Sequence, residues 1–129
     1  MAQSFRDLKV WQRAMQLTVA IYRLTKDFPR EEQYGLTAQI RRSAVSIPSN
    51  IAEGQGRAST GEFRQFLAIA RGSNCEVQTQ LEIARVLEFG ESKLLEEAEA
   101  LSNEVRKMLF GIMESLNERE KLRTVNYEL

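Results

Sequence analysis

A proline stands in the middle of a segment that is otherwise patterned as a helix. Before and after it, apolar residues recur at intervals of three and four, which places them on one face of an α-helix. Pro48 lacks the N–H that would bond the carbonyl of Ala44. Because Ile47 and Ile51 keep the same register on either side, we expect a continuous helix over residues 31–53 that is kinked at Pro48. The alternative is a helix that ends at Ile47 and restarts with Pro48 in its first turn.

Three further segments carry the same helical spacing of apolar residues. Pro29 follows the first, Ser59 and Glu62 have the spacing of a capping box before the next, and Gly90 follows that one. The predicted helices span residues 7–28, 31–53, 60–89 and 92–118. Short connections make consecutive helices antiparallel, so the sequence predicts one all-α domain over residues 1–129, an up-down-up-down four-helix bundle. We expect residues 120–129 to be a frayed or disordered tail.

Two details of these helices are predicted from single residues. Gly54 and Gly56 are the residue type that forms a left-handed cap at the C-terminal end of a helix. Ser92 is placed to cap the start of the fourth helix. The apolar residues expected to face inward from that helix are Leu94, Ala98, Leu101, Val105, Met108 and Ile112.

The composition excludes several classes of function. The chain contains no histidine, so the usual zinc and di-iron ligand sets and histidine-dependent nucleophilic catalysis cannot be assembled. Cys75 is the single cysteine, and without a basic neighbour it is interpreted as a small packing residue. No run approaches the length of a membrane span, and the N-terminus lacks the layout of a secretory signal. We therefore expect a cytoplasmic protein with no metal, no cofactor, no membrane association and no catalytic residues.

Arginines form a row at multiples of seven residues, with Gln78 filling the one gap, so most of them lie along one flank of the third helix. The candidate nucleic-acid-binding residues are Arg41, Arg42, Arg57, Arg64, Arg71 and Arg85. Residues 1–75 hold 11 Lys/Arg against 6 Asp/Glu, while residues 76–129 hold 7 against 12. Two interpretations stay open: the arginines contact phosphates, or they pair with acidic residues of the fourth helix.

Small and apolar residues also occupy helix faces where solvent would be expected. Gly72 lies in mid-helix, where glycine costs about 1 kcal/mol unless close packing needs it. Either the core is wide enough to cover these positions, or identical subunits meet there. The candidate interface residues are Leu8, Trp11, Met15, Tyr22, Ala38, Val45, Ser49, Ala52, Ile69, Gly72 and Ile83. We expect a homo-oligomer.

Three stretches resemble one protein family. They are FRDLKVWQRA at residues 5–14, YGLTAQIRRSAVSIPSNIAEGQGR at residues 34–57 and EFRQFLAIARGS at residues 62–73, followed by Glu76 and Gln80. The long block with its internal Ile-Pro-Ser-Asn is the most specific of these, whereas the fourth helix is generic. In these features the chain resembles the four-helix bundle family of 23S rRNA intervening sequence proteins.

The resemblance carries expectations of its own. It implies a ring-like homo-oligomer, a pentamer, and a distant relation to accessory proteins of diversity-generating retroelements, which bind nucleic acid through basic surfaces. Arg41, Arg42, Arg57, Arg64 and Arg71 match basic positions of the family pattern, and no catalytic residue is implied. The leading hypothesis is a non-enzymatic oligomeric module whose basic rim contacts nucleic acid, RNA or DNA, and most of all structured RNA or an RNA–protein assembly. The alternative is a protein-interaction scaffold that does not bind nucleic acid.

Overall fold

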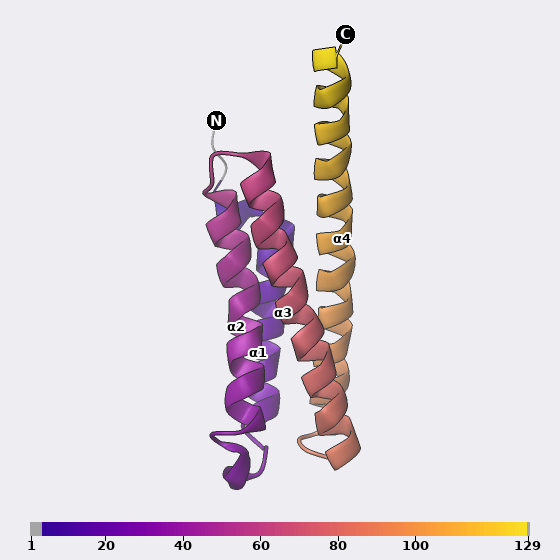
Figure 1. Ribbon diagram of the computed structural model, residues 1–129. Coiled ribbons are helices and arrows are strands. Elements are labelled where there is room, and N and C mark those ends of the chain that lie inside the picture. Colours follow the sequence, from indigo (N-terminus) through magenta and orange to yellow (C-terminus); the bar gives the residue numbers. More distant parts are fainter. Residues whose placement is uncertain (1–3, 129) are drawn as a thin grey trace.

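The computed structural model describes residues 4–128, with side chains described for residues 4–123, and every regular element among them is helical. The elements are η1 (Phe5–Asp7), α1 (Lys9–Thr25), η2 (Arg30–Glu32), α2 (Leu36–Gln55), α3 (Thr60–Leu87) and α4 (Ser92–Glu128). The four α-helices of this described part confirm the predicted all-α four-helix bundle (Figure 1).

Each helix packs against two others. α1 contacts α2 and α4, and α3 contacts the same two helices, with the most extensive packing between α2 and α3. The α2–α3 connection lies at one end of the molecule and the α3–α4 connection at the other, and α4 runs past the ends of its neighbours (Figure 1). This arrangement leaves an outward-facing seam between α3 and α4 and another between α2 and α3.

α2 begins later than predicted, at Leu36 rather than near residue 31. The reason is local, because residues 30–32 form the separate turn η2 and the Glu32 carboxylate accepts a hydrogen bond from the Leu36 N–H at 3.0 Å. A side-chain acceptor at that point satisfies one of the free amides at a helix start. Half of the predicted capping box is found at the start of α3: Ser59 Oγ accepts from the Glu62 N–H at 3.1 Å, whereas the Glu62 carboxylate accepts from the Ser59 hydroxyl at 3.3 Å.

α2 continues through Pro48 without interruption, as predicted, while the kink stays a prediction. The carbonyl of Ala44 would normally accept from the amide of residue 48, which proline lacks. Here the single hydroxyl proton of Thr18, on α1, is shared between that carbonyl at 3.2 Å and the Ala14 carbonyl at 2.9 Å. A side chain from a neighbouring helix therefore replaces the missing helical donor in part.

The predicted left-handed cap at Gly54 and Gly56 is wrong, because Gly56 has the right-handed φ of −80°. Gly54 is instead buried, and a Cβ at this position would lie 2.7 Å from the Cβ of Phe66 on α3. The left-handed residue among those described that ends a helix is Glu88, after α3, with a φ of 59°. Gly54 is thus needed for close approach of two helices, not for chain reversal.

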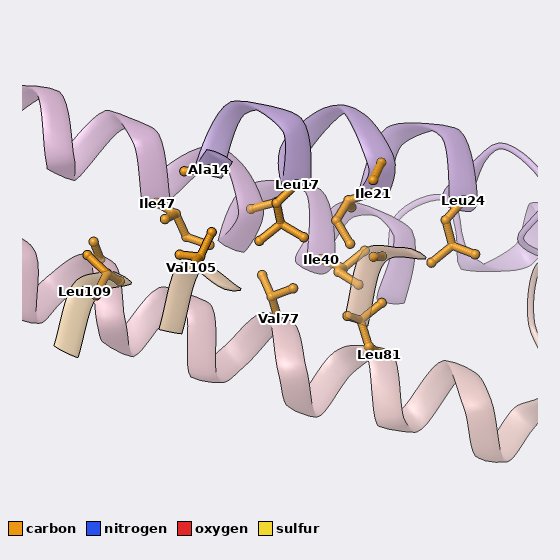
Figure 2. Close-up of a cluster of buried hydrophobic side chains, with 14 of the residues drawn as sticks. Ala14, Leu17, Ile21, Leu24, Ile40, Ile47, Val77, Leu81, Val105 and Leu109 are labelled. Carbon is orange, nitrogen blue, oxygen red and sulfur yellow. The ribbon is translucent and has the colours of Figure 1, made fainter. Parts of the chain in front are cut away.

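All four helices contribute to one apolar core, in which Leu17, Ile47, Val77 and Val105 lie close together (Figure 2). The inward face predicted for α4 is only partly right. Ala98 and Val105 are buried, but the fully enclosed positions between them and beyond include Ser102 and Leu109. The other predicted residues are half-buried on the flanks: Leu94, Leu101, Met108 and Ile112. α4 packs between α1 and α3, so its apolar surface is wider than one stripe.

α4 continues to Glu128 rather than ending near residue 118. Its last turns contain no glycine or proline and are rich in Glu, Arg, Lys and Leu, which favour helix. The predicted tail over residues 120–129 is accordingly helical through Glu128, and Leu129 lies outside the described residues. No helix within residues 4–128 is long and apolar enough to cross a membrane.

Candidate nucleic-acid interface

The arginine row on α3 faces α4, and its two ends have different surroundings. At the C-terminal end, Arg85 pairs with Glu99 of α4 and lies 3.8 Å from Glu82. The hydrogen bond and charge of Glu99 raise the pKa of Arg85 above its usual value, with Glu82 adding to the effect. Arg85 is therefore engaged in helix–helix pairing, as the structural alternative predicted for the row.

Arg64 and Arg71, in the first half of α3, line a hollow of about 720 Å³ against Met113 and Asn117 of α4. Within the side chains of residues 4–123, no carboxylate lies within ion-pair distance of either arginine. Glu62 lines the same hollow. These two guanidinium groups are available to an anion from solution.

α4 adds a cation that sequence reasoning missed. Arg106 and Asn103 line a second hollow, of about 310 Å³, with Gln78 of α3 and with the acidic Glu82 and Glu99. The two hollows follow one another along the same seam, because Gln78 lies seven residues after Arg71 on α3. We call this seam the α3–α4 groove, defined by Arg64, Arg71, Gln78, Arg106, Met113 and Asn117. The recurrence of polar residues at positions 99, 103 and 106 was the available signal in the sequence.

The remaining predicted arginines lie elsewhere, so the six do not form one rim. Arg41 donates through Nε to the Thr25 hydroxyl at 2.8 Å, and its guanidinium lies 4.5 Å from the centre of the Tyr22 ring, both on α1. Arg57 pairs with Glu53 and stacks over Phe66. Both arginines are engaged in contacts within the chain, and neither lines the α3–α4 groove.

Arg42 lines a separate polar hollow of about 440 Å³ between α2 and α3. Ser46 and Ser73 meet there, with their hydroxyl oxygens 2.8 Å apart. Gln80 also lines it and is buried, and its Oε1 has no hydrogen-bond partner among the described residues. Glu76 also lines it, so Glu76 and Gln80, which follow the third family-like stretch of the sequence, both lie on the α2–α3 seam.

The candidate interface residues divide into two groups. Leu8 and Trp11 pack against the apolar core of their own chain, and Met15 and Tyr22 lie half-exposed on other sides of α1. Exposed Val45, Ile69 and Ile83 share the outer side of α2 and α3 with exposed Ser49 and Gly72, with Ala38 and Ala52 half-buried beside them. We call Ala38, Val45, Ser49, Ile69, Gly72 and Ile83 the α2–α3 outer face.

Two neighbouring polar residues of α3 have contrasting surroundings. Cys75 is exposed rather than packed as predicted, and it borders a shallow hollow near Thr79 and Ile83. Asn74 is buried and bonds Ser102 of α4. In the described part of the chain, no cluster of Cys, Asp or Glu is arranged to hold a metal ion.

The fold and its surfaces define a class, the four-helix bundles that present charged and apolar seams on their outer side. The chain belongs to the 23S rRNA-intervening sequence protein family, whose model matches residues 6–111. A crystal structure from Bacteroides thetaiotaomicron, of a protein with unknown function from the S23 ribosomal protein family, is 30% identical with a TM-score of 0.73. The match covers 81% of this chain and 97% of that one. No curated protein matches the sequence.

Proposed function

We propose that this protein is a non-enzymatic helical module that binds structured RNA along the α3–α4 groove. The main support for the proposal is that arginines of the same row on α3 differ in whether they are paired with a carboxylate. Arg85 is paired with α4, whereas Arg64 and Arg71 open onto a hollow without a carboxylate in ion-pair range among the described side chains.

The chemistry of the groove suits a polyanion. Arg64 and Arg71 lie seven residues apart on one helix, about 10.5 Å along its axis, so they can contact separate phosphates of one strand. Each neutralised phosphate releases a counterion, which makes affinity fall as salt rises. Since the family is named for an intervening sequence of 23S rRNA, RNA is the nucleic acid to test first.

Fluorescence anisotropy of a labelled RNA hairpin, repeated over a salt series, tests the proposal. The wild-type protein should bind saturably at low salt, and the double variant R64E/R71E should lose binding by more than tenfold. The matched control is R23E/R30E, which changes the net charge equally at exposed positions on α1 and η2. An equal loss of RNA affinity in both double variants would show that net charge alone explains the effect, and it would contradict a role for the groove.

A second proposal, self-association of the chain, is supported by a different surface. We propose that copies of the chain associate through the α2–α3 outer face. Gly72 lies there in mid-helix, and a Cβ at this position would meet nothing within 4 Å in its own chain. Close packing inside the subunit therefore does not require this glycine, while Ile69 and Ile83 beside it are 51% and 41% exposed. A partner helix approaching this face would make use of both features.

Light scattering distinguishes the assembled from the dissociated chain. A pentamer, the stoichiometry implied by the family resemblance, has about five times the chain mass of 14.8 kDa. I83D should dissociate it, whereas V19D, at a similarly exposed position on α1, should not. A monomer mass for the wild-type protein at micromolar concentration would refute this second proposal.

A further inference from the structure

An exposed aromatic side chain lies in line with the α3–α4 groove. Phe110 of α4 is 61% exposed, and it makes no ring contact with another aromatic among the described residues. Residues three, four and seven positions away along a helix share its face. For Phe110 those positions include Arg106, Met113 and Asn117, all of which line the groove. Phe110 lines neither hollow itself, but it lies on the same face of α4 as these groove residues, about one turn from Arg106 and from Met113.

We infer that the groove receives unpaired nucleotides of an RNA, with a base stacked on Phe110 and the flanking phosphates on Arg64, Arg71 and Arg106. This inference rests on the proposed function and specifies which part of the RNA is bound. Cations that track a backbone, combined with an aromatic ring for the bases, are the features by which proteins hold single-stranded nucleic acid.

A paired helix would not use this arrangement. In duplex RNA the base faces are covered by their stacked neighbours, and the deep, narrow major groove does not admit side chains. An aromatic ring beside the arginines that hold the phosphates can stack only on a base that is splayed out of its own stack, as in loops and bulges. Met113, which lines the hollow together with Arg64 and Arg71, adds apolar surface where a duplex would need polar contacts to its backbone.

Three substitutions of Phe110 separate stacking from apolar packing. F110W keeps an aromatic face, F110L keeps apolar volume without one, and F110A removes both. The control is Y34L, which removes an aromatic side chain that is 89% exposed near the start of α2. Each protein is titrated with a hairpin carrying a large single-stranded loop and with a blunt duplex of the same stem. In F110W, quenching of indole fluorescence on binding reports stacking directly against the background of Trp11, the single native tryptophan.

We expect the hairpin to bind more tightly than the duplex. F110L and F110A should weaken hairpin binding by about fivefold to 150-fold, the range for loss of one stacked base, while F110W and Y34L keep it. Binding of hairpin and duplex with equal affinity, unchanged in F110L, would overturn this inference and leave the proposed function standing. Binding of neither probe at low salt would overturn both. A change in oligomer mass in F110L, with RNA affinity unaltered, would assign Phe110 to a protein contact and also overturn the inference.

Discussion

Asn74 of α3 and Ser102 of α4 exchange two hydrogen bonds inside the apolar core. The Ser102 hydroxyl donates to Asn74 Oδ1 at 2.8 Å, and Asn74 Nδ2 donates to the Ser102 carbonyl at 3.0 Å. Both side chains are almost fully buried, at 1% and 0% exposure. A slip of either helix would leave these polar groups unpaired in an apolar environment, so the pair fixes the register of the α3–α4 groove.

Removal of the serine hydroxyl should be costly. S102A leaves Asn74 Oδ1 buried without its donor, so we expect a loss of about 1–3 kcal/mol in the free energy of unfolding. A double-mutant cycle of S102A and N74A, measured by urea denaturation, should give a coupling energy of about 0.5–3 kcal/mol. Strictly additive effects would contradict a shared register role.

The hydrogen bond from Thr18 to the Ala44 carbonyl should matter only while residue 48 is a proline. T18V should destabilise the wild-type chain by about 1 kcal/mol, because it removes the replacement donor. In the P48A background an amide N–H is restored, so the same substitution should cost less. Thermal or urea unfolding of the four proteins measures this difference, and an equal cost of T18V in both backgrounds would argue against the repair.

Gly54 and Gly72 provide a matched pair of helical glycines. G54A places a Cβ 2.7 Å from that of Phe66, so it should separate α2 from α3 and destabilise the fold by about 1–3 kcal/mol. G72A meets no atom of its own chain within 4 Å, and alanine is favoured over glycine in a helix by about 1 kcal/mol. Unfolding of the dissociated chain should therefore show opposite signs for the two variants. Similar destabilisation by both would contradict the open surroundings described for Gly72, and a G54A variant as stable as the wild type would contradict the close approach to Phe66.

Arg71 and Arg85 should behave differently although they belong to one row. R85Q breaks the pair with Glu99, so it should lower the melting temperature by an amount that shrinks with added salt, and leave RNA affinity within about twofold. R71Q should leave the melting temperature unchanged and reduce the salt slope of RNA binding by about 0.7 for one lost contact to a single strand. Calorimetry and anisotropy on the same preparations check both halves. An R85Q variant that loses RNA binding as R71Q does would extend the interface along the whole row.

The course of the chain could be predicted because its signals are local. Three signals, the apolar periodicity, Pro29 and the Ser59 cap, each depend on only a few neighbouring residues. α1 ends and α3 begins close to the positions that these signals predict. The start of α2 differs because the Glu32 carboxylate is recruited across a turn. The role of Gly54 was missed because close approach to Phe66 is a relation between two helices, which the glycine itself does not reveal.

The surfaces were harder to predict than the core. A spacing of seven residues correctly places Arg64, Arg71 and Arg85 on one side of α3. The spacing does not predict that Arg85 pairs with Glu99, because this contact depends on the rotation of α4 about its own axis. Phe110 and Arg106 were missed for the same reason, since the apolar stripe predicted for α4 did not define which of its flanks meets α3.

The contact between Thr18 and Ala44 also bears on how the chain folds. A helix whose backbone lacks a donor in its middle is a poor helix in isolation, because nucleation and propagation both depend on consecutive hydrogen bonds. α2 completes its bonding only when α1 is docked against it. A peptide spanning residues 36–55 should therefore have little helical structure, and the two helices should gain protection from hydrogen exchange together, as one cooperative unit.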